Sequence, residues 1–346
     1  MYLNWSKETN TEELKIVCNL IKNGEVVVFP TETVYGIGAN ALDKDAVGKI
    51  FVAKGRPSDN PLIVHLADKN KIGEVATDIS EVEQQLIDAF MPGPFTIILK
   101  KKMTIPSIVS AGLDTIGVRI PNNIIAKAII QYSGVPIAAP SANISGKPSG
   151  TTIDDIRQEL ENKVSAIVDG GETQIGLEST VVKVIDDTPV ILRPGAITPE
   201  DIIKVVGKCK IDDKVFGKVE KDAKVESPGM KYRHYAPETK CILINYENPL
   251  DQEFYINQQI RKYKGNVVYL GFKEHRDKII VSDSRYIELG SKDNLEEIAK
   301  NLYSSIRKAD KIGAEIIIIE GVKKEGLGIA IMNRLLRTCE YNTMEG

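Results

Sequence analysis

The fold is decided by the stretch EVVVFPTETVYGIG, which spans residues 25–38. Its first five residues predict a buried β-strand that ends at Pro30. Hydroxyl groups and glycines follow at once, and α/β folds usually bind ligands at the carboxyl ends of their strands. A plain strand-to-helix turn would explain this segment equally well, so function has to be argued from its neighbours.

Helical and strand-like patterns alternate on both sides of this stretch. Apolar spacing predicts a helix over 11–23, which stops at Gly24, and another over 43–54. The remaining apolar runs predict strands at 62–67, 96–99, 116–120, 136–139, 166–169 and 179–185, with helices at 80–91, 122–132 and 152–161. We therefore expect a mixed α/β domain over residues 1–206.

The rest of the chain predicts a linker and a second domain. Residues 207–240 are rich in lysine and acidic residues and show little periodicity, which is typical of a solvated linker. Residues 241–346 return to apolar runs, at 241–246, 266–271 and 315–322, separated by helical stretches near 250–263 and 292–310. This alternation predicts a smaller parallel-sheet domain.

Composition excludes several classes of protein. The 346 residues carry a net charge of -3, and the isoelectric point is near 5.9, which argues against a chain-wide electrostatic grip on nucleic acid. The four cysteines show no CxxC spacing, so neither a zinc site nor a disulfide framework is expected. The polar N-terminus and the lack of a long apolar run predict a cytoplasmic protein with no membrane span. His275 lies in the charged run FKEHRDK, where we expect it to be solvated and without a role.

A basic loop follows the second predicted helix. Lys54 and Arg56 flank Gly55, and Pro57 and Pro61 stiffen the loop. Two cations on a rigid loop suit a polyphosphate, although charges at a helix C-terminus would give the same pattern. The chain has no Walker A motif, so an ATP site would have to be built in another way.

Strand alternation predicts that Arg119 and His65 each point away from the apolar face of their strand. In residues 115–120, Thr115, Gly117 and Arg119 share the face opposite the apolar residues, which leaves room for a carboxylate or phosphate. His65 likewise leaves the apolar face of its strand, although a lone strand histidine is more often structural than a ligand contact.

Small and polar residues also gather at later strand ends. Residues 138–150 (AAPSANISGKPSG) can bring backbone N–H groups close to a nucleotide. Residues 176–180 (GLEST) and 192–195 (LRPG) place polar groups at strand ends, where turn chemistry alone would also explain them. The chain has no GxSxG elbow, nucleophilic cysteine context or HExxH motif, which favours catalysis by positioning and charge stabilisation.

Together these segments resemble the YrdC/Sua5 family of threonylcarbamoyl-AMP synthases. The resemblance runs in order through PTETVYGIG, KGRP, NPL-V-H, MPGPFT, VRIP, PSAN-SG, GLESTVV and LRPG. It continues through SPGMKYRHYAP and GLGIAIMNRL, which fit the two-domain Sua5 type rather than the short YrdC type. It implies a twisted mixed sheet with a concave basic cavity, and a smaller Rossmann-like parallel α/β domain at the C-terminus.

The resemblance also implies a reaction and a set of site residues. L-Threonine, bicarbonate or CO2, and ATP with Mg2+ would give threonylcarbamoyl-AMP, which a downstream tRNA threonylcarbamoyl transferase would use for N6-threonylcarbamoyladenosine at position 37 of tRNA. Lys54, Arg56 and Arg193 would stabilise phosphoryl charge, with no protein metal ligands assigned. L-Threonine would be held by Thr33, His65, Arg119, the backbone at Ala139, and Ser179. ATP would be held by Lys54, Arg56, Asn60, Thr115, Ser141, Asn143, Ser149, Arg193 and the linker residue His234.

Three further expectations concern the linker and the alternatives. A lid formed by residues 227–237 would exclude water from the hydrolysable anhydride. One alternative function is a double-stranded RNA-binding module, because a concave basic surface could hold RNA, although the acidic isoelectric point argues against it. The other is a carbamoyl transferase with a different acceptor, which rests on analogy of fold.

Overall fold

The computed structural model describes residues 1–5, 11–217, 226–227, 234–264 and 266–346. Contacts divide the chain into two units. The first unit comprises Met1–Ser145, Ser149–Gln174 and Glu178–Tyr232. The second comprises Gly146–Pro148, Ile175–Leu177 and Arg233–Gly346, so two short loops of the N-terminal half belong with the C-terminal half. Much of the predicted lid, residues 228–233, lies outside the described residues.

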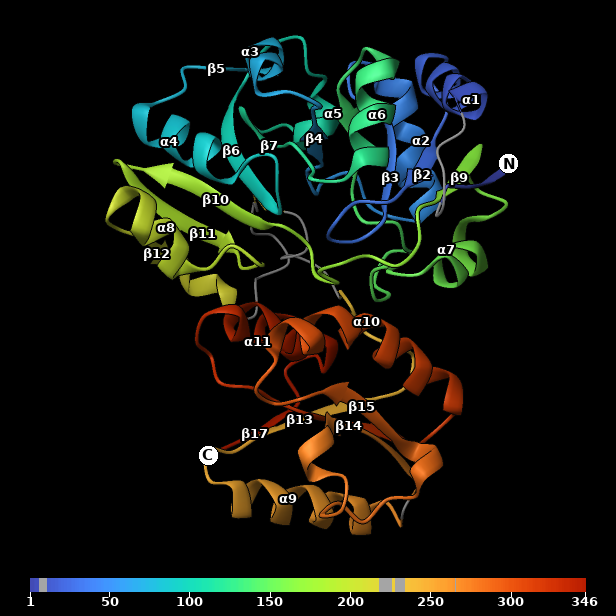
Figure 1. Cartoon of the computed structure of the whole chain (residues 1–346), viewed down its shortest axis with the longest axis vertical. Coiled ribbons are helices and arrows are strands. Elements are labelled where there is room, and N and C mark those ends of the chain that lie inside the picture. Colours follow the sequence, from blue (N-terminus) through green and yellow to red (C-terminus); the bar gives the residue numbers. More distant parts are fainter. Residues whose placement is uncertain (6–10, 218–225, 228–233, 265) are drawn as a thin grey trace. The chain divides into compact units, whose positions relative to one another are not determined.

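The first unit is built on a large mixed sheet (Figure 1). Parallel and antiparallel pairs alternate irregularly along it, as the resemblance implied. The strand order is β1 (Tyr2–Asn4), β9 (Ala166–Asp169), β2 (Val27–Phe29), β3 (Gly36–Asn40), β8 (Ile137–Ala138), β4 (Ile63–His65), β7 (Thr115–Arg119), β6 (Phe95–Lys101), β10 (Thr180–Ile185), β11 (Thr188–Arg193) and β12 (Lys210–Ile211), with β5 (Ala76–Thr77) paired to β6.

Helices cover both faces of this sheet. On β2, Val27 and Phe29 join one apolar cluster with α1 (Thr11–Lys22) and α6 (Ile124–Ser133), while Val28 joins another with α2 (Lys44–Lys54). A strand that is apolar on both faces reads as a continuous apolar run, which is why EVVVF predicted it correctly. The predicted helices over 80–91, 122–132 and 152–161 are confirmed as α4 (Glu81–Phe90), α6 and α7 (Ile153–Leu160).

The strand-to-helix turn considered for the opening stretch is wrong, because residues 36–40 form β3. This strand pairs antiparallel with both β2 and β8. Gly38 makes the close packing possible, since a Cβ there would lie 2.6 Å from Ile137 Cγ2 and 2.7 Å from the Phe29 ring. The sequence pattern also missed three elements near residue 200, which are β11, β12 and α8 (Pro199–Val206). Because β12 pairs with β11, the start of the predicted linker adds a strand to the first unit's sheet.

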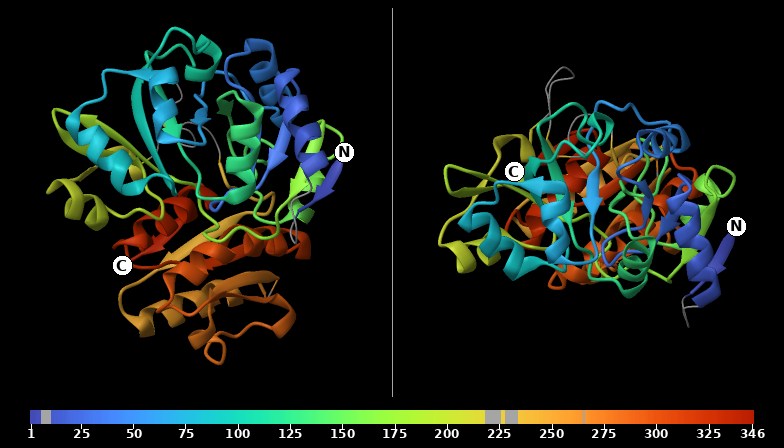
Figure 2. Two further views of the ribbon diagram at one scale, coloured as in Figure 1. Left: turned by 45° about the horizontal axis from the view of Figure 1, so that its top comes forward. Right: turned by 90° about the horizontal axis from the view of Figure 1, so that it is seen from above.

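The second unit is a five-stranded parallel sheet between two helical layers. Its order is β15 (Tyr286–Gly290), β14 (Val267–Phe272), β16 (Ile316–Glu320), β13 (Cys241–Asn245) and β17 (Thr343–Glu345). Within this unit, α9 (Pro249–Lys262) lies on one face, and α10 (Leu295–Ile312) and α11 (Leu327–Thr338) lie on the other (Figures 1 and 2). The predicted parallel α/β domain is confirmed, although β15, α11 and β17 were not predicted.

His275 corrects the sequence prediction, because it is buried and bonded rather than solvated. It follows β14 directly, is 7% exposed, and its Nδ1 lies 2.7 Å from Glu320 Oε1 at the end of β16. Tyr269 and Gln252 also donate to the Glu320 carboxylate, at 2.6 Å and 3.2 Å. The charged run around His275 hid this role because its partner lies 45 residues further along the chain.

The stability of the second unit should therefore fall as pH rises above neutrality. The hydrogen bond to Glu320 raises the pKa of His275 above its ordinary value of 6.5. A raised pKa favours folding while the imidazole stays protonated, and this contribution is lost as pH rises through the folded-state pKa. Amide hydrogen exchange of β14 and β16, corrected for intrinsic rates, should show less protection at pH 9 than at pH 6. His275→Gln should remove most of that difference, and an unchanged difference would contradict the assignment.

Among the described residues, every helix is too short or too polar to span a bilayer.

Candidate active site

His65 and Arg119 lie side by side on adjacent strands of the first unit. Parallel pairing of β4 with β7 sets His65 opposite Arg119 in register. Both side chains leave the face on which Val64 and Val118 enter the main apolar cluster, as strand alternation predicted. Register across β8 places Ile137 next to His65 on the same face, so the pair lies further along the face that α1 and α6 cover.

His65 is held as a neutral imidazole. Its Nδ1 lies 3.1 Å from the Ile63 carbonyl, and the residue is 4% exposed. Burial, and then the Arg119 charge beside it, lower the pKa of His65 to about 3. A neutral imidazole can exchange hydrogen bonds with an uncharged hydroxyl at every physiological pH. The pair thus combines a permanent cation with a neutral polar group.

We expect the first unit to lose stability as the solution is acidified. His65 has a lower pKa folded than unfolded, so its contribution is complete above about pH 6.5 and declines below it as the unfolded chain binds a proton. Denaturant unfolding, followed by a probe in the first unit, should therefore give less stability at pH 5 than at pH 7. His65→Asn should flatten this dependence, while His275→Gln should leave it unchanged. If the His65→Asn variant still loses stability between pH 7 and pH 5, other groups cause that loss.

Arg119 contacts a buried acid that sequence reasoning did not single out. Its Nη2 lies 2.8 Å from Glu32 Oε1, and its Nε donates to the Gly93 carbonyl at 3.4 Å. Glu32 was visible only as part of the polar run after the first strand, and nothing in that pattern indicates a partner 87 residues later. Arg119, which lies beside His65, is thus one half of a buried ion pair.

The other three predicted threonine contacts are hydrogen bonded to their own neighbours within the first unit. Thr31 donates its hydroxyl to the Val34 carbonyl at 2.6 Å, so Thr33 must donate to Thr31 in their 2.8 Å contact, which leaves the Thr33 oxygen as an acceptor. The Ala139 N–H already donates to the Ile63 carbonyl at 2.9 Å. Ser179 shares a 2.8 Å hydrogen bond with Thr96, whose strand β6 lies next to β7.

Arg193 belongs to the same neighbourhood through Ser179. It lies on β11, which pairs antiparallel with β10, and its guanidinium donates to the Ser179 carbonyl from Nε at 3.2 Å and from Nη2 at 3.0 Å. Nη2 also donates to the Ser179 hydroxyl at 3.1 Å. The predicted phosphate-binding and threonine-binding residues thus meet at Ser179.

Lys54 is buried at the end of α2, where it holds the loop that follows β8. Its Nζ donates to the carbonyls of Ser141 and Asn143, at 2.5 Å and 2.6 Å, and the residue is only 2% exposed. Burial, and then the nearby Arg56 charge, lower the pKa of Lys54 well below its usual range. Two buried cations that destabilise each other are a favourable place for an anion.

Arg56 braces the loop that sequence reasoning identified. Its Nη2 donates to the carbonyls of Asn60 and Pro61, at 3.1 Å and 3.2 Å, and its guanidinium lies 6.0 Å from the Phe51 ring centre. The Asn60 side chain is fully buried, and neither its oxygen nor its nitrogen is hydrogen bonded to any described residue. A buried amide without hydrogen-bond partners lowers the stability of the fold, and a ligand could supply those partners.

The other predicted ATP residues fall into four places. Ser141 donates to the Asn143 side-chain oxygen at 2.6 Å, inside the loop that Lys54 holds. Ser149 donates to the Glu178 carboxylate, and Thr115 begins β7. His234 lies in the second unit, beside Tyr235, with ring centres 5.6 Å apart. Its part in ATP binding stays a prediction.

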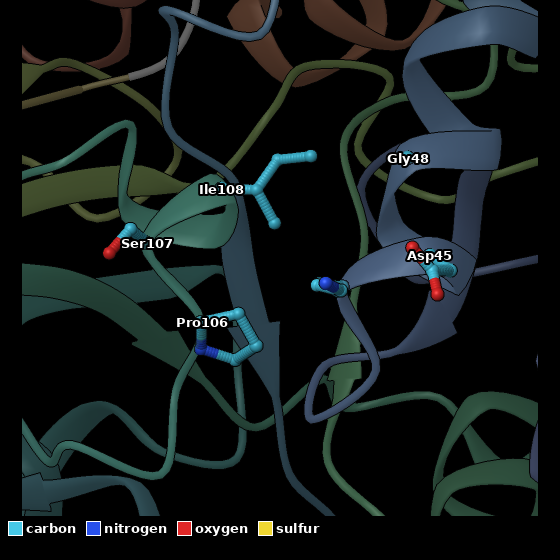
Figure 3. Close-up of a pocket in the computed structure, with 6 residues that line it drawn as sticks. Asp45, Gly48, Pro106, Ser107 and Ile108 are labelled. Carbon is cyan, nitrogen blue, oxygen red and sulfur yellow. The ribbon is translucent and has the colours of Figure 1, made fainter.

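An open surface pocket of about 500 Å3 in the first unit is separate from these residues (Figure 3). It is lined by Lys44, Asp45, Gly48, Pro106, Ser107 and Ile108, from the start of α2 and the turn at α5 (Ser107–Ser110). None of the predicted site residues lines it. The described part of the chain also contains no group of three His, Cys, Asp or Glu side chains that could hold a metal ion.

Family comparisons cover nearly the whole chain. Residues 19–195 match the Sua5_yciO_yrdC family model, described as telomere recombination. Residues 197–339 match the model described as threonylcarbamoyl-AMP synthase, C-terminal domain.

Individual relatives agree with the family match. The threonylcarbamoyl-AMP synthase of Pyrococcus abyssi is 43% identical over 96% of this chain and 96% of its own. That of Bacillus subtilis is 43% identical over 95% of this chain and 93% of its own. The crystal structure of P. abyssi Sua5 complexed with L-threonine has a TM-score of 0.93, at 42% identity, over 100% of this chain and 99% of that one. The chain belongs to the Sua5/YrdC family of threonylcarbamoyl-AMP synthases, in its two-domain Sua5 form.

Proposed function

We propose that this chain converts L-threonine, bicarbonate or CO2, and ATP into threonylcarbamoyl-AMP and pyrophosphate. The observation that carries the proposal is the arrangement of buried polar groups on one sheet. Arg119 can bind a ligand carboxylate, and the neutral His65 beside it can hydrogen bond to a ligand hydroxyl. Lys54 and Arg56 add a buried pair of like charges that an anion would stabilise. Relatives named threonylcarbamoyl-AMP synthase, which match 93–96% of this chain, support the same reaction.

The chemistry needs two bond-forming steps. The amine of L-threonine attacks the carbon of CO2 and loses a proton, or attacks the carbon of bicarbonate with breaking of a C–O bond and loss of water, and either route gives a carbamate. A carbamate oxygen then attacks the α-phosphorus of ATP, the bond from that phosphorus to the bridging oxygen breaks, and pyrophosphate leaves. Charge grows on the phosphoryl oxygens and on the leaving group during the second step, so preorganised cations are the most effective catalysts.

The predicted residues of the first unit divide between binding L-threonine and binding ATP. Arg119 would bind the threonine carboxylate, and Thr33 and His65 would recognise its hydroxyl, with Ser179 and the backbone at Ala139 completing that site. Arg56 and Arg193 would stabilise the phosphoryl charge. Lys54 would do so together with the Ser141–Asn143 loop that it holds. The unbonded Asn60 amide, Thr115 and Ser149 would contact the nucleotide.

Mg2+ fits this site only as a partner of the triphosphate. The described residues offer no three-ligand cluster, and Mg2+ commonly binds through substrate phosphates and water with few protein ligands. When bound, it would neutralise phosphate charge. We therefore propose that ATP brings the ion to the protein.

Pyrophosphate release should require both co-substrates. Purified protein with ATP and Mg2+ should release pyrophosphate only when L-threonine and bicarbonate are both present, because no carbamate forms without them. Release that occurs with another amine as readily as with L-threonine would favour a carbamoyl transferase with a different acceptor. No release in any mixture, together with salt-sensitive binding of double-stranded RNA, would favour the RNA-binding alternative.

The chemistry of the product indicates which kind of enzyme would use it. A mixed carbamic–phosphoric anhydride is an activated donor, so a tRNA threonylcarbamoyl transferase is the downstream partner we propose. We place this step in the cytoplasm, with no direct role for nucleic acid binding by this chain.

A further inference from the structure

Glu32 is a buried acid that the reaction described above does not use. It lies in the loop between β2 and β3, next to Thr33, and is 4% exposed. Neither carboxylate oxygen accepts a hydrogen bond from any residue that the structure describes. Its charged contact is with Arg119, where Nη2 and Oε1 are 2.8 Å apart but not aligned as a hydrogen bond. A buried carboxylate normally has several donors, so this one is poised for a donor from elsewhere.

The ion pair between Glu32 and Arg119 indicates which group would donate a hydrogen bond to Glu32. Our inference rests on the proposed function, in which Arg119 binds the threonine carboxylate. An α-amino acid carries its ammonium one carbon away from its carboxylate. A ligand whose carboxylate reaches Arg119 therefore brings its ammonium to the region that Glu32 occupies. An ion pair with an unbonded acid is complementary to a zwitterion, since each protein charge meets the opposite charge of the ligand.

We propose that Glu32 receives the α-ammonium of L-threonine and removes one of its protons. The N–H bond breaks, its electron pair stays on nitrogen, and the proton moves to a Glu32 oxygen, so that two opposite charges become two neutral groups. The step supplies the lone pair that must attack the carbon of CO2 or bicarbonate. An ammonium cannot form the carbamate, so the reaction at neutral pH needs a proton acceptor at this place.

The charged surroundings suit this transfer. Arg119 faces Glu32 from β7, and His65 faces Arg119 from β4 as a neutral group. Once the threonine carboxylate engages Arg119, the guanidinium is shared between two carboxylates, and a Glu32 oxygen is left to face the ammonium. Binding of the correct zwitterion thus prepares the base that acts on it.

Glu32→Gln tests the proposal because it keeps the shape and removes the basicity. We expect kcat/KM for L-threonine to fall on the order of 100-fold at pH 7, a typical effect for a general base. The variant should regain rate by about tenfold per pH unit, up to the pKa of the free amine, because hydroxide in solution replaces the lost base. Wild type should show a much flatter profile. Glu32→Asp, with its shorter side chain, should restore part of the neutral-pH rate.

Two controls distinguish a loss of folding from a loss of proton transfer by Glu32. Asp169→Asn changes another buried carboxylate, one that accepts hydrogen bonds from Tyr2 and the Gly171 N–H, and should alter stability without changing the shape of the pH profile. ATP-analogue binding without threonine should be retained in Glu32→Gln. A Glu32→Gln enzyme as fast as wild type, or one slowed equally at every pH, would overturn the proposal. If wild type makes no threonylcarbamoyl-AMP, the proposed function itself fails.

Discussion

Arg56→Ala should lower the rate of pyrophosphate release by roughly 10²- to 10³-fold, the scale for removing one preorganised charge from a transition state. Arg56 is held rigidly because its Nη2 donates to the Asn60 and Pro61 carbonyls, so it requires little reorganisation when charge develops. The loss should appear mainly in kcat, since the charge on the leaving pyrophosphate grows only as the bond to phosphorus breaks. Steady-state kinetics at saturating L-threonine and bicarbonate measure it.

Two variants show whether the guanidinium itself is responsible. Arg56→Lys keeps a positive charge but loses the planar fork, so it should recover only part of the rate. Arg157→Ala removes an exposed arginine of α7 that pairs with Glu161 at the end of that helix, and should leave kcat unchanged. If Arg56→Ala retains more than about a third of the wild-type kcat, Arg56 does not act on the phosphates in the manner of a transition-state clamp.

Lys54→Met should have the second large effect, on both stability and turnover. Methionine fills similar volume, but it leaves the Ser141 and Asn143 carbonyls without the donor that now satisfies them. We expect about 2–3 kcal/mol of lost stability from these buried acceptors. We also expect kcat/KM for ATP to fall on the order of 100-fold, because the loop loses its anchor and the phosphates lose a cation. Denaturant unfolding and initial-rate kinetics report the two effects separately.

Lys49→Met is the matched control for this variant. Lys49 lies on the same helix and donates to the Gly24 carbonyl at 2.9 Å, but its side chain is exposed and its ion pair with Glu25 is on the surface. It should change stability by less than about 1 kcal/mol and leave ATP kinetics intact. Equal effects from Lys49→Met and Lys54→Met would mean that Lys54 has no special role in the site.

Local patterns predicted the elements of this protein better than their arrangement. Strand alternation correctly put His65 and Arg119 on the face opposite Val64 and Val118, because that requires only the two-residue period of a strand. Their register against each other depends on how β4 and β7 pair, and no local pattern specifies it. The same limit applies to β3, since Gly38 has to lack a side chain because Phe29 and Ile137 approach it from two other strands.

Charged residues were the hardest to interpret from sequence. His275 stands in a charged run that resembles a solvated segment, and Glu32 stands in a polar run at a strand end. Both are nevertheless buried against partners far along the chain. Lys54 was singled out from the sequence for its charge, and its role in the site stays a prediction, but the loop carbonyls that it holds could not be predicted. A buried charge is stable only with a partner, and that partner is set by tertiary structure.

The most direct test of the central claim is mass spectrometry of the reaction product made from 13C-bicarbonate. Protein incubated with ATP, Mg2+, L-threonine and labelled bicarbonate should yield threonylcarbamoyl-AMP with the label in its carbamoyl carbon. It should not do so when L-threonine is omitted. AMP and pyrophosphate without any labelled adduct, even after rapid quenching, would contradict the account, because the chain would then hydrolyse ATP without joining threonine to it.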